Sequence, residues 1–266
     1  MVVFPNAKIN IGLNIVKKLP SGYHAIESCF YPIPLTDALE VIENDTLSFA
    51  SSGIEIPGNE TDNLCLKAYR LVKQNHSIPA VAIHLHKNIP IGAGLGGGSS
   101  DGAFMIKLLN QKFDLQMRAE EMEALAGQLG SDCPFFIKNK PVFVEGTGNE
   151  FSEIDFSLQG KYLVLIMPKI HVSTAQAYSG VIPATPDNGL KKGLERLDFS
   201  QLQSVVKNDF EKSVFYQFPA LLEVKEDLLG AGAIYASMSG SGSAVYGIFE
   251  SKPTFASSHP FQVFQL

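Results

Sequence analysis

The stretch Pro90-Ile91-Gly92-Ala93-Gly94-Leu95-Gly96-Gly97-Gly98-Ser99-Ser100-Asp101 is the densest run of glycine in this 266-residue chain. Because glycine has no Cβ atom, such a backbone can adopt left-handed conformations and direct successive N–H groups towards one point. A helix is predicted from Ser99 to about Asn110, and its free N-terminal amides and positive dipole end would add to the same anion site. The hydroxyls of Ser99 and Ser100 offer further donors or a metal ligand. The sequence therefore predicts a phosphate-binding loop over residues 90–100.

Three other motifs compete for the same residues. A Walker A loop fits the spacing from Gly92 to Gly97, but Gly98 stands where that motif needs lysine. A dinucleotide-binding fingerprint should follow a strand directly, whereas Lys87–Pro90 intervenes and no acidic strand end lies about 20 residues further on. A nucleophile elbow around Ser100 also needs a strand directly before it. A dinucleotide-dependent oxidoreductase and a serine hydrolase thus remain alternatives, although the strand that each motif needs directly before it is missing. A further alternative is that the segment is only a flexible loop without a ligand.

The remaining pattern mixes strands and helices without regular alternation. Period-two hydrophobicity predicts strands, and helices are predicted where apolar residues recur every three to four positions. The predicted strands are 2–16, short strands within 38–50, 81–85, 142–145, 162–167, 234–237 and 244–249; the predicted helices are one capped by Asp62 and running through Val72, then 99–110, 118–129, 199–210 and 219–229, with a loop at 182–190. This order predicts an α+β fold with a soft boundary near residues 150–160.

Composition excludes several classes of protein. With 45% hydrophobic and 18% charged residues, the chain is not broadly disordered. A net charge of −6 argues against bulk affinity for nucleic acid or anionic membranes. We expect no membrane span and no signal peptide, and nothing points to an obligate protein partner. Three cysteines cannot close a disulfide set, so we expect a reducing, cytoplasmic location.

Three separated segments resemble the motifs of the GHMP kinases (galactokinase, homoserine kinase, mevalonate kinase and phosphomevalonate kinase). They are Pro5–Asn10, the loop Pro90–Ser100 and the run Met238–Ser243. Gly22-Tyr23-His24 and Gly130–Phe136 are similar to the branch that phosphorylates a cytidyl-diphosphate-linked polyol in non-mevalonate isoprenoid synthesis.

The resemblance implies a two-domain α+β kinase with its active site in the interdomain cleft. We expect an N-terminal ATP-binding domain over 1–155 and a C-terminal domain over 156–266. ATP bound by residues 90–100 and Mg²⁺ are the implied cofactors, and the metal ligands cannot be assigned from the sequence. A GHMP kinase for a different alcohol and a nucleotide-binding protein without turnover are the remaining alternatives.

The resemblance also implies a catalytic pair, Lys8 and Asp132. By pattern alone, Lys8 could lie on a solvated strand face, although the neighbouring asparagines are unusual in a strand. Asp132 could equally be a turn or cap residue. As a member of this family, the chain would use Asp132 as the base that accepts the substrate hydroxyl proton, and Lys8 to stabilise charge. Asp101 is a rival carboxylate, but we expect it in the first turn of its helix.

The implied contacts with the polyol substrate come from six residues. Tyr23 and Tyr178 are expected to stack on cytosine, and His24 to hydrogen-bond its polar edge. The full set is Asn10, Tyr23, His24, Phe30, Thr174 and Tyr178. Each aromatic residue taken alone is more commonly a core residue. His84 and His86 share one strand face but have no third ligand nearby, which argues against zinc.

Overall fold

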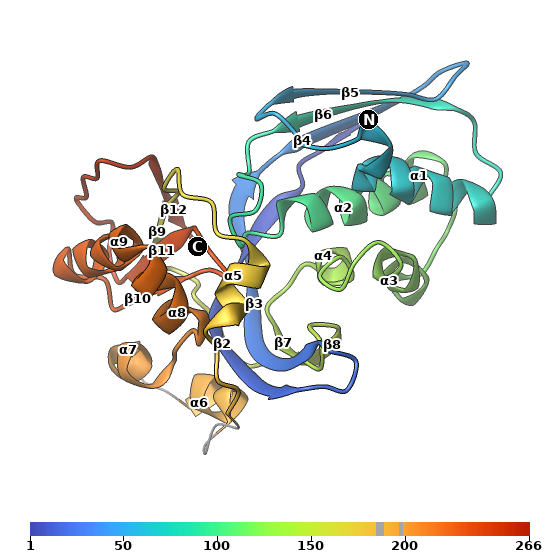
Figure 1. Cartoon of the computed structure of the whole chain (residues 1–266). Coiled ribbons are helices and arrows are strands. Elements are labelled where there is room, and N and C mark those ends of the chain that lie inside the picture. Colours follow the sequence, from blue (N-terminus) through green and yellow to red (C-terminus); the bar gives the residue numbers. More distant parts are fainter. Residues whose placement is uncertain (185–188, 197–198) are drawn as a thin grey trace. The chain divides into compact units, whose positions relative to one another are not determined.

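The structure is a computed structural model that describes residues 1–184, 189–196 and 199–266 (Figure 1). The chain forms two compact units that are interleaved in sequence. Unit 1 comprises Met1–Lys8, Pro32–Ile91 and Gly96–Lys140, and unit 2 comprises Ile9–Tyr31, Gly92–Leu95 and Pro141–Leu266. The domain boundary between residues 155 and 156 stays a prediction. Of the loop predicted at 182–190, residues 185–188 lie outside the described part.

Unit 1 contains a four-stranded sheet covered by helices. Its strand order is β1 (Val2–Val3), β4 (Ala38–Glu43), β6 (Val81–Lys87) and β5 (Ser48–Gly53). Strand β6 pairs antiparallel with β4 and parallel with β5. Its side chains alternate strictly, so that Ile83, Leu85 and Lys87 are buried while His84 and His86 are exposed. The alternation therefore buries Lys87, the last residue of the strand.

The helices of unit 1 pack against one another and against this sheet. They are the short η1 (Glu60–Asp62), then α1 (Leu64–Asn75), α2 (Gly97–Lys112), α3 (Ala119–Gly127) and α4 (Phe135–Lys138). Helix α1 packs on α2, and α2 in turn contacts α3, α4 and the sheet. In Figure 1, α1 and α2 lie on the same side of the strands β4, β5 and β6. Helix α2 is thus the central helix of unit 1, and its first residue is Gly97.

A second sheet has the order β2 (Asn6–Lys18), β3 (His24–Thr36), β7 (Val142–Glu145) and β8 (Glu150–Glu153). Strand β3 was not predicted because Pro32 and Pro34 interrupt its pattern, and proline normally argues against a strand interior. Strand β2 is nearly fully buried over its first eight residues, including Lys8 and Asn10 at 4% and 2% exposure. The polar face of this strand is therefore not an ordinary solvated face.

Unit 2 contains an entirely antiparallel sheet of order β10 (Tyr235–Met238), β11 (Val245–Phe249), β9 (Tyr162–Ile166) and β12 (Phe261–Gln265). Its helices are α5 (Thr174–Ser179), α6 (Leu190–Arg196), η2 (Phe199–Gln201), α7 (Leu202–Val205), α8 (Phe210–Gln217) and α9 (Pro219–Gly230). Helix α9 packs on β10 and β11. The core between them is formed by apolar side chains such as Val164, Leu221, Leu228 and Val245. Strand β12 shows that the end of the chain completes this sheet.

Most predicted elements are present, and four details were wrong. The strand predicted over 2–16 is divided into β1 and β2, with Phe4 and Pro5 outside both. The helix predicted over 199–210 is divided, because the chain leaves the helix at Val206 and α8 starts again at Phe210. Asn63, and not Asp62, caps α1, with its Oδ1 accepting from Cys65 N at 2.8 Å. Helix α2 starts two residues before the predicted Ser99.

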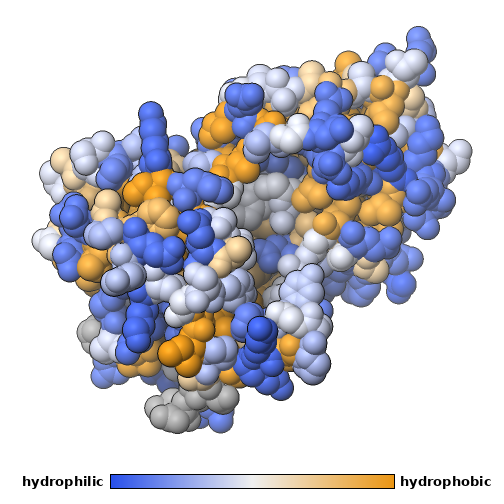
Figure 2. All heavy atoms as spheres, in the orientation of Figure 1, coloured by the Kyte–Doolittle hydropathy of each residue, from blue (hydrophilic) through white to orange (hydrophobic). Residues whose placement is uncertain are grey.

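The surface mixes apolar and polar side chains. On the face shown in Figure 2, hydrophobic residues are interspersed with hydrophilic ones. None of the helices in the described ranges combines the length and the hydropathy that crossing a membrane requires. The three cysteines, Cys29, Cys65 and Cys133, are buried free thiols.

Candidate functional site

The glycine-rich loop alternates between anchoring side chains and bare backbone. Ala93 and Leu95 are buried at 6% and 1% exposure. The glycines between and beside them, Gly92, Gly94 and Gly96, have φ angles of 69°, 77° and 70°. Residues with a side chain rarely adopt these angles, so glycine is required at each of the three positions. Left-handed glycines of this kind are typical of loops whose backbone N–H groups bind anions.

The second half of the loop forms the N-terminus of α2 in unit 1. Gly96 precedes the helix as its N-cap, and no side chain caps the first amides. A Cβ atom added to Gly98 would meet nothing within 4 Å, so open space lies above this first turn. Since the first amides of a helix have no intrahelical acceptor, they are available to an anion in that space.

Lys8 and Asp132 lie close together beside this helix start. The distance from Lys8 Nζ to Asp132 Oδ2 is 3.8 Å, and the two side chains are 5% and 32% exposed. A Cβ atom on Gly96 would lie 3.2 Å from Cε of Lys8, which places the lysine directly against the N-cap of α2. Burial lowers the pKa of Lys8, while the nearby Asp132 carboxylate acts in the opposite direction. Unit 1 therefore brings together an ammonium, a partly exposed carboxylate and a helix N-terminus.

A second charged cluster, which the sequence did not predict, lies beneath the same helix. Lys87 Nζ donates to Asp37 Oδ2 and to Asp101 Oδ2, the latter at 2.7 Å. All three side chains are at most 4% exposed. Burial raises the pKa of Asp101 to about 8, against the opposing effect of Lys87. Asp101 is the fifth residue of α2, so its expected place in the first turn was wrong.

This cluster fixes the approach to the loop. Asp37 Oδ1 accepts from Asn88 N at 2.6 Å and from Ile89 N at 2.8 Å, just before Pro90. A Cβ atom on Gly97 would lie 3.3 Å from Lys87 Nζ, so the ammonium lies directly under the first turn of α2. The three charges come from positions 37, 87 and 101, and no local pattern connects them. Only the strand alternation of β6, which makes Lys87 face inward, could have indicated the cluster.

The third glycine-rich segment, Met238–Ser243, lies against the first half of the loop within unit 2. Ser239 Oγ donates to Gly94 O at 2.8 Å, and Ala244 N donates to Ala93 O at 3.2 Å. A Cβ atom on Gly94 would lie 1.9 Å from Ser239 O, so this contact tolerates no side chain. Ser239 Oγ also accepts from Asn10 N at 3.3 Å. Ser239 therefore contacts both other segments that resemble GHMP kinase motifs, through Gly94 and through Asn10.

The predicted substrate residues, all in unit 2, differ in exposure. His24 and Tyr178 stack with their ring centroids 4.7 Å apart and an interplanar angle of 20°. Tyr23 is 70% exposed, while Phe30 is 2% exposed and faces Phe151 edge-on at 6.5 Å. Asn10 Nδ2 donates to Ser28 Oγ at 2.9 Å. Thr174 is exposed as the first residue of α5, which Ser173 caps. Contacts of these residues with a substrate stay predictions.

The alternatives that use Ser100 or histidine gain no support. Ser100 is fully buried, and its Oγ has no hydrogen-bond partner among the described residues. A nucleophile must be reachable by its substrate, so this hydroxyl does not suit a hydrolase. In the described ranges, no three side chains of histidine, cysteine, aspartate or glutamate are grouped so that they could hold a metal ion. His84 and His86 both contact Ser52 Oγ on the exposed face of β6.

Comparison with known proteins gives a consistent result. Residues 63–140 match the model of the GHMP kinases N terminal domain, and residues 190–257 match that of the GHMP kinases C terminal. The 4-diphosphocytidyl-2-C-methyl-D-erythritol kinase of Bacteroides fragilis is 54% identical over 253 residues, which cover 94% of this chain and 92% of that protein. The enzyme of the same name from Parabacteroides distasonis is 51% identical over 254 residues, covering 96% and 93%.

A solved structure agrees with these relatives. The crystal structure of a 4-(cytidine 5'-diphospho)-2C-methyl-D-erythritol kinase matches with a TM-score of 0.78 and 30% sequence identity. The match covers 93% of this chain and 90% of that chain. The similarity therefore extends over both units.

Proposed function

The chain belongs to the GHMP kinases, and from this we propose that it transfers the γ-phosphoryl group of ATP to the 2-hydroxyl of 4-diphosphocytidyl-2-C-methyl-D-erythritol. The acceptor is taken from the names of the relatives at 54% and 51% identity, and the pathway would be non-mevalonate isoprenoid synthesis. The observation in this chain that carries the proposal is the pair of Lys8 and Asp132 at the N-terminus of α2.

Asp132 is the proposed base. Its side chain is about one-third exposed, which leaves the carboxylate accessible to an acceptor hydroxyl. In the proposed step, Asp132 accepts the hydroxyl proton while the hydroxyl oxygen forms a bond to the γ-phosphorus. The bond from that phosphorus to the bridging oxygen breaks, and ADP leaves with the electron pair. Phosphoryl transfer needs little covalent chemistry from the protein, so positioning and charge provide most of the rate enhancement.

Lys8 is the proposed electrostatic partner. Its ammonium lies 3.8 Å from Asp132, close enough to keep that carboxylate oriented. The same positive charge would oppose the negative charge on the transferred group. Because Lys8 is buried, its interactions are screened less by solvent than those of a surface lysine.

The amides from Gly96 to Ser99, which precede the first intrahelical hydrogen bond from Ser100 N to Gly96 O, are the proposed phosphate ligands in unit 1. They lie at an uncapped helix start, under open space at Gly98. Mg²⁺ is commonly held by nucleotide phosphates, water and one or two carboxylates. The hydroxyl of Ser99, which lies against Cys133, would provide one suitable oxygen donor. When bound, the ion would neutralise charge on the phosphates.

Aromatic side chains of unit 2 are the proposed cytidyl site. Tyr23 offers an exposed ring, and the stacked rings of His24 and Tyr178 offer an aromatic face and polar ring nitrogens. Stacking of a base on an aromatic ring contributes about 1–3 kcal/mol. Buried free thiols suit a reducing compartment, so we place the enzyme in the cytoplasm.

The direct test is the release of ADP from ATP, measured with and without 4-diphosphocytidyl-2-C-methyl-D-erythritol. We expect ADP release to depend on this acceptor and to produce the 2-phosphate. Mevalonate and homoserine serve as alternative acceptors in parallel reactions. Turnover with one of these alcohols and none with the cytidyl polyol would reject the proposed acceptor and retain the kinase.

A further inference from the structure

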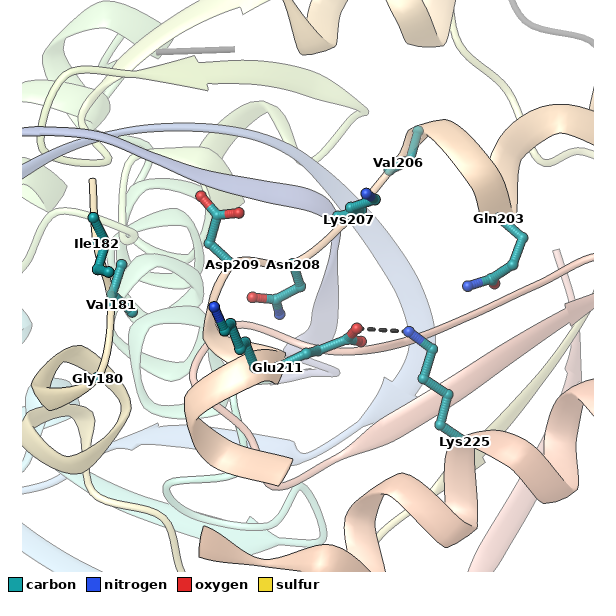
Figure 3. A pocket seen from close by; sticks show the side chains of 11 residues that line it. Gly180, Val181, Ile182, Gln203, Val206, Lys207, Asn208, Asp209, Glu211 and Lys225 are labelled. Carbon is teal, nitrogen blue, oxygen red and sulfur yellow. Dashed lines mark hydrogen bonds and ion pairs between the residues drawn. The ribbon is translucent and has the colours of Figure 1, made fainter. Parts of the chain in front are cut away.

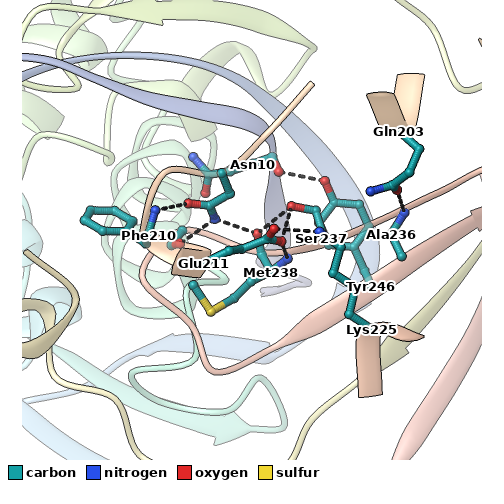
Figure 4. A network of polar contacts seen from close by, with 11 residues as sticks. Asn10, Gln203, Phe210, Glu211, Lys225, Ala236, Ser237, Met238 and Tyr246 are labelled. Atoms are coloured by element: carbon teal, nitrogen blue, oxygen red, sulfur yellow. Dashed lines mark hydrogen bonds and ion pairs between the residues drawn. The ribbon is translucent and has the colours of Figure 1, made fainter. Parts of the chain in front are cut away.

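We propose that Asn208, Glu211 and Lys225 are positioning residues, which hold the turn after β10 in the geometry that fixes the first half of the phosphate loop. These residues lie outside the three segments that resemble GHMP kinase motifs. The inference concerns ATP binding and so rests on the proposed function. The contacts that carry it all lie within unit 2, and Figure 4 shows the part of the network around Glu211, Ser237 and Met238.

Asn208 holds both sides of Ser239. Its side-chain amide Nδ2 donates to Met238 O at 2.8 Å and to Gly240 O at 2.9 Å. Its Oδ1 accepts from Phe210 N at 3.0 Å, at the start of α8. Asn208 is only 3% exposed, so the amide uses both hydrogens on the two carbonyls that flank Ser239. The turn is thereby bound to the beginning of α8.

Glu211 and Lys225 hold the residues just before that turn. Glu211 Oε1 accepts from Met238 N at 2.9 Å and from Ser237 Oγ at 3.0 Å. Its Oε2 accepts from Lys225 Nζ at 2.6 Å, which connects α8 to α9. The side chains of this pair are 12% and 15% exposed. Hydrogen bonds to an ionised group are roughly twice as strong as neutral ones, so this carboxylate is a firm anchor for β10.

The turn passes this constraint to the loop. Ser239 is hydrogen-bonded to Gly94 O and to Asn10 N, and Ala244 N to Ala93 O. The approach of Gly94 to Ser239 leaves no space for even one carbon atom. Leu95 is covalently followed by Gly96, the N-cap of α2. A shift of the turn therefore moves the backbone that leads into the proposed phosphate site.

A pocket beside the network makes the proposal testable in folded protein. Asn208, Glu211 and Lys225 line a pocket of about 420 Å³, together with the segment 180–182 (Figure 3). Figure 3 shows the ion pair of Glu211 and Lys225 at its wall. Shortening the side chain of Glu211 or of Lys225 enlarges this pocket and creates no sealed cavity. The large penalty for an empty cavity in the core is therefore avoided.

The experiment compares Glu211→Ala with a matched control, Gln203→Ala. Gln203 Oε1 accepts from Ala236 N at 2.7 Å, so the control also removes a side-chain hydrogen bond to β10, but it does not reach the turn. A third protein carries Glu211→Gln with Lys225→Gln, which keeps an acceptor for Met238 N and replaces the ion pair by an amide pair. Amide exchange of Asn10 and Ala244 is measured by NMR without nucleotide, and KM for ATP is measured separately from kcat.

Glu211→Ala is expected to speed exchange at both amides and to raise KM for ATP by about tenfold, the effect of losing one or two hydrogen bonds. Gln203→Ala should leave both quantities unchanged, and the double glutamine variant, which keeps an acceptor for Met238 N but loses the charge, should lie between the wild type and Glu211→Ala. Exchange in Glu211→Ala no faster than in Gln203→Ala would overturn the proposal, as would an unchanged KM for ATP.

If Glu211→Ala does not fold, Glu211→Gln alone is compared with the double glutamine variant. The single substitution leaves Lys225 facing an amide, so it should speed exchange at Ala244, and the second substitution should restore protection. Equal exchange in the two proteins would then overturn the proposal. Because exchange is measured without substrates, the wrong acceptor or an inactive protein would reject the proposed function without affecting this result.

Discussion

Gly98→Ala is expected to stabilise the protein and to weaken ATP binding. The residue is the second of α2, it is exposed, and its added methyl group would meet no atom within 4 Å. Alanine is favoured over glycine within a helix by about 0.5–1 kcal/mol. This should raise the melting temperature by a few degrees, about 2–4 °C per kcal/mol for a protein somewhat smaller than this one.

ATP binding should change in the opposite direction. If phosphate oxygens contact the first amides of α2, the new methyl group occupies part of their space. Overpacking of this kind costs about 1–3 kcal/mol, which is about a 5- to 150-fold loss of affinity. Isothermal titration with a non-hydrolysable ATP analogue measures the loss, and differential scanning fluorimetry measures the stability.

Gly230→Ala is the matched control. Gly230 is the last residue of α9, it is exposed, and its added methyl group also meets nothing within 4 Å. It should keep wild-type ATP affinity. A Gly98→Ala protein with a raised melting temperature and unchanged ATP affinity would refute the position of the phosphates. A lowered melting temperature would refute the open space above the helix.

Three further predictions concern the base site, the charged pair and the buried cluster. Tyr23→Ala should raise KM for the cytidyl substrate by about 5- to 150-fold, because stacking contributes about 1–3 kcal/mol, and should leave KM for ATP nearly unchanged. The control is Tyr216→Ala, at a tyrosine of α8 that is 88% exposed. Equal effects of Tyr23→Ala on both substrates would remove Tyr23 from the site. Burial lowers the pKa of Lys8, so its ammonium loses a proton at a lower pH than an ordinary lysine, whose pKa is about 10.4. We therefore expect kcat/KM to fall on the alkaline side before the pH reaches that value. The same alkaline fall in the residual activity of Lys8→Met would contradict this assignment. The pKa of Asp101 is raised to about 8, so the folded protein keeps a proton that the unfolded chain releases near pH 4, and the stability due to this group is lost as the pH rises towards 8. Urea unfolding should therefore show that Asp101→Asn is more stable than the wild type by an amount that grows between about pH 4 and pH 8. A gain in stability that does not depend on pH would exclude this explanation.

The strands and helices with an uninterrupted pattern were predictable from the sequence. Strand β6 and helix α9 are close to their predicted ranges because hydrophobic periodicity decides both. Strand β3 was not, since Pro32 and Pro34 contradict the strand pattern locally and only pairing with neighbouring strands compensates. The first turn of α2 was missed because Gly97 and Gly98 have low helix propensity.

The residues of the site that lie in the motifs were predictable from the sequence, whereas the buried residues that hold those motifs in place were not. Lys8 and Asp132 were selected by resemblance, and the structure brings them to 3.8 Å. The cluster around Lys87 was invisible because its three charges come from distant positions and pair only in the folded core. Asn208 was likewise not singled out, since it fell inside the helix predicted over 199–210, which the structure divides before Phe210.

The most direct test of the account is the rate of ADP formation by Asp132→Asn with ATP and 4-diphosphocytidyl-2-C-methyl-D-erythritol. The substitution keeps size and shape and removes the proton acceptor; Asp62→Asn, at an exposed carboxylate paired with Lys67 at 3.0 Å, is the control. We predict that Asp132→Asn melts like the wild type and binds both substrates, but forms ADP about 10²- to 10⁴-fold more slowly. A folded Asp132→Asn protein with the wild-type rate would contradict the account.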